Sequence, residues 1–219
     1  MKIPFFISFI ILASCGNGSQ KNTIDKSALA NVEPVQVQVQ NELKKAYFAS
    51  GCFWCSGVIY ENVIGVKEVI YGYSGGHTEN PTYQQVGTGR TGHSESVEVT
   101  YDPKEVSFKT LVDVYFGSQN VTQQNGQGPD RGSEYRSILF YQNETEKQII
   151  EAKIAELDAQ YREPIAAEVL PFQKFWRAEE YHQDYEKKNP NNPYIQNVSV
   201  PRLNKFKEKF PELLKENKE

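Results

Sequence analysis

Residues 45–73 constrain the fold more than any other stretch of the sequence, because they predict a complete β-turn-α-β unit. Residues Lys45–Ala49 are typical of a short strand, and Gly51 frees the backbone for a tight turn. Residues Ser56–Asn62 favour a helix, and Val66–Tyr73 favours a second strand. A unit of this kind is consistent with an α/β domain.

The turn of this unit carries Cys52 and Cys55, three positions apart. We expect Cys52 at the helix N-terminus, where the helix dipole and unpaired N–H groups favour a thiolate. Helical spacing brings the Cys55 thiol round to the same side, as in dithiols that open and close a disulfide. A disulfide closing so small a loop constrains the unfolded chain very little, so the pair indicates chemistry. The bulky Phe53 and Trp54 between the cysteines indicate an apolar pocket against the sulfur.

The composition is that of a soluble globular protein. The chain has 219 residues, of which 38% are hydrophobic and 12% aromatic, enough for one ordinary domain plus extensions. The net charge is −4 and no basic residues cluster densely, so nucleic-acid binding has no electrostatic support.

Residues 1–14 are typical of an export signal. Lys2 supplies a positive start, and Ile3–Leu12 is an apolar run too short to span a bilayer as a stable helix. The following Leu12-Ala-Ser-Cys15 resembles the lipobox of bacterial lipoproteins, which implies cleavage before Cys15 and lipidation of that cysteine. A plain secretory leader with a chance cysteine is the alternative. Both interpretations predict an exported protein, and the first predicts one tethered to a membrane and facing the periplasm or the cell exterior.

The rest of the chain divides into three parts. Residues 15–42 are polar and without hydrophobic period, which predicts a flexible tether. Residues 43–190 contain the predicted catalytic domain, with two long loops that are candidates for function. Residues 191–219 form a charged, helical extension. Its thin apolar side consists of Leu203, Phe206 and Phe210.

A predicted strand over residues 95–101 carries the most informative carboxyl group. Its alternation puts Glu95, Val97 and Val99 on one face. A carboxyl group aimed at a core has a raised pKa, which suits a proton donor. The alternative is that Glu95 lies at the strand end, in water.

Six separated motifs together resemble the methionine sulfoxide reductase A family in order and spacing. The resemblance covers residues 44–189 and implies a single α/β domain (an α+β-type sandwich) with a mixed central sheet, flanking helices and long active-site loops. The motifs are Gly51-Cys-Phe-Trp54, Asn80-Pro-Thr-Tyr83, Thr91-Gly-His-Ser-Glu95, Tyr101-Asp-Pro103, Gln127-Gly-x-Asp130-x-Gly-x-x-Tyr135-Arg-Ser137 and Glu180-Tyr-His-Gln183.

The resemblance implies reduction of methionine S-sulfoxide in proteins and peptides, and of free methionine sulfoxide. It assigns Cys52 as the nucleophile and Glu95 as the acid. For the substrate pocket, it implies that Phe53 and Trp54 form an apolar wall for the S-methyl group. It also implies that Tyr83 and Tyr135 hydrogen-bond the sulfoxide oxygen, and that the carboxylate of Asp130 supports the site.

The expected cycle leaves Cys52 as a sulfenic acid. Cys55 is the only cysteine left to resolve it, which gives a Cys52–Cys55 disulfide that an external dithiol such as thioredoxin must reduce. No organic or metal cofactor is expected, and the protein is expected to act as a monomer.

Two departures from the family pattern stand out. Cys55 occupies a position where the family commonly has glycine, and no cysteine follows it in the sequence. Gln119-Asn-Val-Thr122 replaces a usual His-Asp-Pro-Thr run, and we expect this to change a loop without removing catalysis.

Three other functions fit parts of the pattern. A thioredoxin-like dithiol exchanger would use the same cysteines but has no need of Glu95 as an acid. A surface-displayed binding protein would use the aromatic pocket without turnover. A metal site built from the thiols and the three histidines is disfavoured, because their spacing fits no zinc pattern. The histidines are His77, His93 and His182.

Overall fold

The computed structural model describes residues 32–39 and 41–216 of the chain. The predicted export signal, the lipid attachment predicted at Cys15 and the first half of the predicted tether lie outside the described residues. No helix in the described part of the chain is long and apolar enough to cross a membrane.

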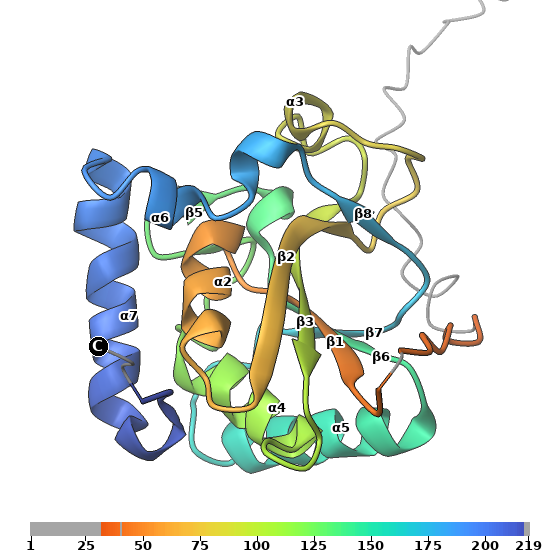
Figure 1. Ribbon diagram of the computed structural model, residues 1–219. Coiled ribbons are helices and arrows are strands. Elements are labelled where there is room, and N and C mark those ends of the chain that lie inside the picture. The colour runs from red at the N-terminus through yellow and green to blue at the C-terminus, as the bar shows by residue number, and fades with distance from the viewer. Residues whose placement is uncertain (1–31, 40, 217–219) are drawn as a thin grey trace, which may run out of the picture.

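A six-stranded mixed sheet forms the centre of the domain (Figure 1). The strand order is β7-β6-β1-β3-β2-β8, and every neighbouring pair is antiparallel except the parallel pair β6 and β7. The predicted mixed sheet with flanking helices is therefore confirmed. The strands are β1 (Lys44–Ala49), β2 (Val66–Ser74), β3 (Ser94–Tyr101), β6 (Ile138–Tyr141), β7 (Glu168–Pro171) and β8 (Phe175–Arg177), and a separate ribbon pairs β4 (Gly126–Gln127) with β5 (Asp130–Arg131).

The longer helices share the larger hydrophobic core with one face of the sheet. Alternation along β1 sends Ala46 and Phe48 into this core. The longer helices are α2 (Phe53–Glu61), α4 (Phe108–Gly117), α5 (Glu144–Asp158) and α7 (Val200–Lys209). Short helical turns are α3 (Tyr83–Val86), η1 (Ser133–Tyr135), η2 (Glu180–His182), α6 (Tyr185–Lys188), the π-helical η3 (Ile195–Ser199) and η4 (Pro211–Leu213).

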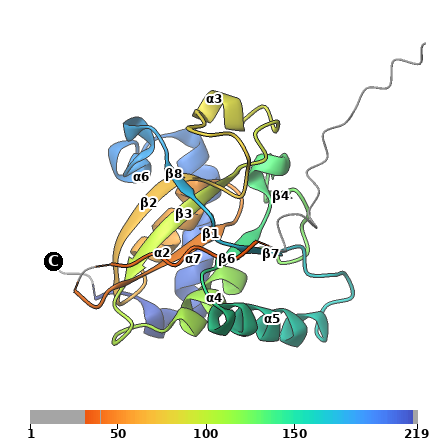
Figure 2. The same ribbon diagram turned by 90° about the vertical axis from the view of Figure 1, so that its right-hand side faces the viewer.

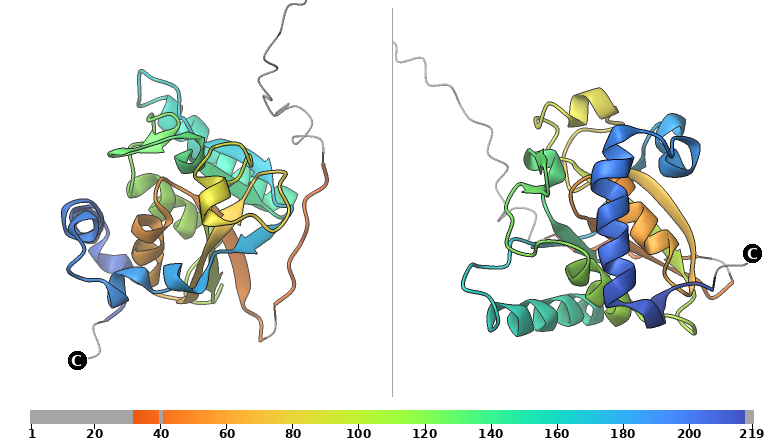
Figure 3. Two further views of the ribbon diagram at one scale, coloured as in Figure 1. Left: turned by 90° about the horizontal axis from the view of Figure 1, so that it is seen from above. Right: turned by 90° about the vertical axis from the view of Figure 1, so that its left-hand side faces the viewer.

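Helix α2 is enclosed between the sheet and α7 (Figures 1 and 3). It packs against β2 and β3 on one side and against α7 on the other. Gly57 allows the close approach to the sheet, because a Cβ at this position would come within 2.1 Å of the Tyr71 ring. Since several sides of α2 are buried, the first turns of the helix carry apolar and small residues all round.

The opposite face of the sheet carries a smaller apolar cluster, which includes Tyr47 and Phe172. Residues 32–39, part of the predicted tether, contact the domain beside this cluster. Val35 N donates to the Phe172 carbonyl at 2.8 Å, and Val37 N donates to Gln142 Oε1 at 2.8 Å. Figure 2 views the molecule from this side, with α2 and α7 behind the sheet.

The structure corrects several predicted boundaries. Helix α2 begins at Phe53 rather than Ser56, and a short helix, α3, forms within the first predicted loop. Strand β6 begins at Ile138, and Ser133–Tyr135 form a 3₁₀ turn before it. Ser94 Oγ fixes that turn by donating to the carbonyl of Glu134 at 2.9 Å.

The charged C-terminal segment returns to the catalytic half of the chain. Leu203 and Phe206 of α7 are buried, as their spacing on one helical side predicts. Beyond α7, Ile64 N donates to the Leu213 carbonyl at 2.8 Å and Lys215 N donates to the Asn62 carbonyl at 2.9 Å. The segment is thus attached to both the length and the C-terminal end of α2.

Candidate active site

Cys52 lies at the N-cap of α2, as the sequence predicts. The turn before it requires glycine at position 51, where φ is +67° and a Cβ would approach Gln127 Cβ to 2.4 Å. Cys52 is 6% exposed and Cys55, one helical turn later, is 1% exposed. Both cysteines are free thiols.

Glu95 is the second residue of strand β3 and faces the N-terminus of α2. Its Oε2 accepts a hydrogen bond from Phe53 N at 3.0 Å, and the residue is 2% exposed. The alternative of a water-facing Glu95 is therefore wrong. Burial raises the pKa of Glu95 to about 8, although the hydrogen bond from Phe53 acts in the opposite direction. The carboxyl group is mostly neutral at pH 7 and can donate a proton.

The two thiols differ in acidity, and one of them loses its proton more easily than the other. Burial, followed by the hydrogen bond and charge of Cys55, raises the pKa of Cys52 well above its usual value. The hydrogen bond from Cys52 lowers the pKa of Cys55 to about 6, with burial opposing and the charge of Arg202 assisting. The thiolate expected at Cys52 from the helix start stays a prediction, and burial opposes it by raising the pKa of Cys52. The Phe53 N–H group at this helix start donates to Glu95.

Aromatic rings form a wall beside the thiols. The Phe53 ring stacks on the Tyr83 ring at a centroid distance of 6.4 Å and meets His182 at 5.0 Å. Trp54 stacks on Tyr185 at 3.7 Å with the ring planes 5° apart. Two predicted wall residues, Phe53 and Trp54, therefore belong to one continuous aromatic cluster.

Two phenols face Cys52 and Glu95. Burial, followed by the charges of Glu95 and Cys52, raises the pKa of Tyr83 to about 12. Tyr135 hydrogen-bonds to Tyr83, and burial together with the charge of Glu95 raises its pKa as well. Both hydroxyl groups stay neutral and can donate hydrogen bonds to an oxygen atom bound between them and Glu95.

The predicted supporting carboxylate, Asp130, lies on β5 and meets a residue that sequence reasoning missed. Tyr194 Oη donates to Asp130 Oδ2 at 2.7 Å and lies 3.6 Å from the Cys55 sulfur. The only local feature that indicates Tyr194 is that it is an aromatic residue directly after Pro193. The Pro and Asn residues around it form no pattern that predicts a functional residue.

A second unpredicted residue, Glu179, fixes Tyr83. Its two carboxyl oxygens accept hydrogen bonds from Tyr83 N at 2.9 Å and from Tyr73 Oη at 2.8 Å. The structure brings all eight predicted catalytic and pocket residues together around α2, from segments spread over the domain. They are Cys52, Phe53, Trp54, Cys55, Tyr83, Glu95, Asp130 and Tyr135.

The loop that departs from the family pattern supports the turn before Cys52. Gln119 Oε1 accepts hydrogen bonds from Ser50 Oγ at 2.7 Å, Ser137 Oγ at 3.1 Å and Gln127 Nε2 at 3.1 Å. Arg202 donates to Ser50 Oγ at 2.7 Å from the other side. Ser50 is therefore held by both the 117–133 loop and α7.

The histidines do not assemble with the thiols. The His93 ring joins two backbone segments, with Gly76 N donating to its Nδ1 at 3.0 Å and its Nε2 lying 2.7 Å from the Thr78 carbonyl. His182 packs against Phe53. No group of three or more His, Cys, Asp or Glu side chains suited to a metal ion occurs in the described residues.

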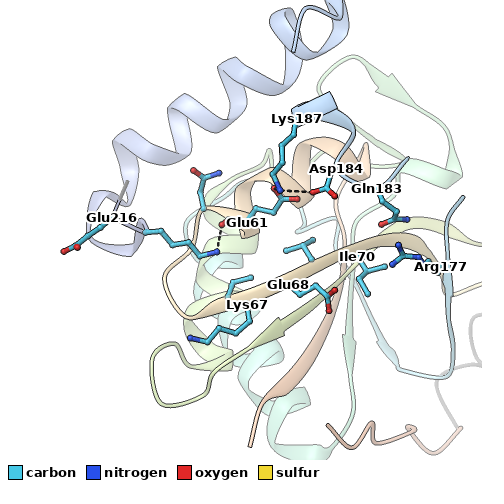
Figure 4. Close-up of a pocket in the computed structure, with 13 residues that line it drawn as sticks. Glu61, Lys67, Glu68, Ile70, Arg177, Gln183, Asp184, Lys187 and Glu216 are labelled. Carbon is cyan, nitrogen blue, oxygen red and sulfur yellow. Dashed lines mark hydrogen bonds and ion pairs between the residues drawn. The ribbon is translucent and has the colours of Figure 1, made fainter. Parts of the chain in front are cut away.

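A hollow of about 730 Å³ lies away from the sulfur atoms, between β2 and the end of α2 (Figure 4). Its walls carry charges of both signs that pair with one another. Lys187 contacts Glu61 at 2.9 Å and Asp184 at 2.8 Å. No cysteine, histidine or tyrosine lines it, so it offers no thiol for redox chemistry.

Comparison with known proteins decides the family. The family model for peptide methionine sulfoxide reductase matches residues 44–214. The chain belongs to this family. The peptide methionine sulfoxide reductase MsrA of Pasteurella multocida is 45% identical over 172 residues, which cover 78% of this chain and 99% of that protein.

Solved structures of the family share the fold. Methionine sulfoxide reductase A of Corynebacterium diphtheriae aligns with a TM-score of 0.63 at 33% identity, covering 73% of this chain and 83% of that one. Reduced Mxr1 from Saccharomyces cerevisiae aligns with a TM-score of 0.64 at 29% identity, covering 74% and 93%. Both alignments extend over most of the described domain.

The unequal thiols give the first prediction. Titration of the reduced protein, followed by the ultraviolet absorbance of thiolate, should show one thiolate appearing near pH 6, where Cys55 loses its proton. Cys55→Ser should abolish this transition, whereas Cys52→Ser should keep it, because the serine hydroxyl still donates to Cys55. The opposite pattern would place the acidic thiol at Cys52.

Proposed function

We propose that the protein reduces methionine S-sulfoxide in proteins and peptides, and free methionine sulfoxide, to methionine. The observation that carries this proposal is a buried carboxyl group held beside a buried thiol, with Glu95 bonded to the first N–H of the helix that Cys52 caps. The names of the family and of its similar members support the substrate. A dithiol exchanger of the thioredoxin type has no use for such a buried acid, because no oxygen atom is protonated.

In the first step, Cys52 attacks the sulfoxide sulfur after its proton passes to the Cys55 thiolate. Glu95 donates a proton to the sulfoxide oxygen, which is otherwise a poor leaving group. Tyr83 and Tyr135 hold that oxygen by hydrogen bonds, while Phe53 and Trp54 enclose the methyl group. The new bond between Cys52 and the substrate sulfur then breaks with its electron pair on the methionine sulfur, while the protonated oxygen passes from that sulfur to Cys52. Methionine leaves, and Cys52 becomes a sulfenic acid.

In the second step, Cys55 attacks the sulfenic sulfur of Cys52. An S–S bond forms, the S–O bond breaks, and the hydroxide leaves as water after taking a proton. A dithiol protein of the thioredoxin type then reduces the Cys52–Cys55 disulfide, because the sequence supplies no further thiol after Cys55. The cycle needs no organic or metal cofactor.

We propose that the chain works outside the cytoplasm, attached to a membrane by lipid on Cys15. The positive start, the short apolar run and the lipobox-like Leu12-Ala-Ser-Cys15 support this location. Residues 16–42 would then join the lipid to the domain, with Val35 and Val37 held against its edge.

The role of Glu95 predicts the effect of its amide. Glu95→Gln should lower the sulfoxide reduction rate roughly 100- to 10,000-fold, because the amide cannot protonate the oxygen. Alkylation of the thiols should still occur. In the wild type, the first-turnover rate should fall as pH rises through about 8, where the raised pKa of Glu95 leaves the group ionised. A fully active amide variant would refute the role of Glu95 as the acid.

The role of Cys55 predicts a stalled enzyme. Cys55→Ser should release one equivalent of methionine and then stop, with a sulfenic acid on Cys52 that a cyclic diketone probe can trap. Its activity should not recover with thioredoxin as the donor. Sustained turnover under these conditions would show that another thiol reduces Cys52 directly.

The proposed location predicts lipid labelling. A labelled fatty acid fed to a bacterium expressing the full chain should appear in the protein, and Cys15→Ser should abolish the label. Retention of the label in Cys15→Ser would contradict lipid attachment at this residue. A wild-type chain that is exported but carries no label would indicate the plain secretory leader instead.

A further inference from the structure

The C-terminal segment surrounds Cys55 with hydrogen-bonding groups that the first step does not use. Tyr194 Oη lies 3.6 Å from the Cys55 sulfur, and the hydroxyl group of Ser199 also hydrogen-bonds to that sulfur. Ser199 is completely buried. It ends the π-helical turn η3, a type of turn that often occurs at functional sites.

Arg202, one helical turn further, adds a positive charge. Its guanidinium group donates to the Ser118 carbonyl at 2.8 Å, the Ser50 carbonyl at 3.1 Å and Ser50 Oγ at 2.7 Å. It forms no ion pair with a carboxylate of the described residues. Arg202 and Cys55 line the same cavity of about 710 Å³, between α7 and the 117–130 loop, and the charge of Arg202 favours the Cys55 thiolate.

Glu186 determines where the Ser199 proton points. Ser199 Oγ hydrogen-bonds to Glu186 Oε1, and burial raises the pKa of Glu186 to about 7, with the charge of Cys55 assisting. Ser199 has one hydroxyl proton. When Glu186 is ionised, Ser199 donates to it; when Glu186 is neutral, Glu186 donates to Ser199 and the Ser199 proton is free for Cys55.

The titratable and charged groups that face Cys55 come from several elements. Within this set Arg202 carries the positive charge. Negative charges on the acidic groups would disfavour a thiolate at Cys55. The set consists of Cys52 before α2, Glu95 on β3, Asp130 on β5 through Tyr194, Glu186 on α6 through Ser199, and Arg202 on α7.

We propose that Ser199 and Arg202 are positioning residues for the second step, which hold the sulfur of Cys55 as an anion while it attacks the oxidised Cys52. In the resting enzyme the thiol of Cys52 supplies the leading hydrogen bond to Cys55. Oxidation removes that S–H group, so the anion then depends on the C-terminal segment. This role rests on the proposed function, because it requires the Cys52–Cys55 disulfide.

The atoms balance without any further reactant. The electron pair of the Cys55 sulfur forms the S–S bond, and the S–O bond of Cys52 breaks. The proton that Cys55 took from Cys52 in the first step passes to the departing hydroxide, which leaves as water. Cys55 is oxidised and the sulfenic sulfur of Cys52 is reduced.

The test separates the two steps in a single turnover. The reduced full-length protein is mixed with methionine sulfoxide without a reductant and quenched with an alkylating reagent at several times. Released methionine reports the first step, and the Cys52–Cys55 disulfide reports the second. The series is repeated at several pH values, so that the ionisation of Cys55 opposite the oxidised Cys52 shows as a pH midpoint of the second step. The variants are Arg202→Gln and Ser199→Ala, with Lys205→Gln as the matched control.

Arg202→Gln should slow disulfide formation about tenfold, because it removes a charge that stabilises the thiolate. Ser199→Ala should do the same below about pH 7, where neutral Glu186 leaves the Ser199 proton free for Cys55. The pH midpoint of that step should move upward, because the pKa of Cys55 rises. Methionine release should change much less. Lys205→Gln should match the wild type, because this exposed residue on the same helix lines the same cavity and loses the same charge.

Arg202 also holds Ser50, so its variant requires a check of folding by circular dichroism. Ser199→Ala removes a single hydroxyl group and tests the proposal if Arg202→Gln fails to fold. Wild-type rates and an unshifted pH midpoint in the folded variants would overturn the proposal. If instead the wild type released methionine without forming the disulfide, the resolving role of Cys55 and this role would fall together.

Discussion

The hydrogen bond from Phe53 N to Glu95, 3.0 Å long, is the contact on which the site depends. It joins the start of helix α2 to the central strand β3 and keeps a buried carboxyl group beside Cys52. The contact thus fixes the position of the acid, while burial keeps the carboxyl group mostly neutral against the effect of the hydrogen bond and raises the pKa of Cys52.

The groups of the proposed substrate site and the groups around Cys55 lie on two different sides of α2. Phe53, Tyr83 and Glu95 face the proposed substrate side, where an oxygen atom must be bound and protonated. On the other side, Tyr194 and the C-terminal helix α7 enclose Cys55. The C-terminal segment thus folds back onto α2 and supplies the buried Cys55 thiol with hydrogen-bond donors that α2 itself does not provide.

The sequence predicts the parts of the site that neighbouring residues form. It misses the parts that need contacts between residues far apart in the chain. The strand, the glycine turn and the helix around Cys52 follow from neighbouring residues, and motif spacing places Glu95, Tyr83 and Asp130. Tyr194 meets Cys55 across 139 positions, so no local pattern indicates it. The pKa values of the thiols depend on burial, on each other and on Glu95, which only the packed domain brings together.

The central claim is that Cys52 and Cys55 together supply the two electrons of one reduction. The most direct measurement is peptide mass mapping of the reduced wild-type protein after mixing with excess methionine S-sulfoxide in the absence of any reductant. The account predicts one methionine released per protein and a complete Cys52–Cys55 disulfide. Release of methionine with either cysteine still open to alkylation, or no release at all, would contradict it.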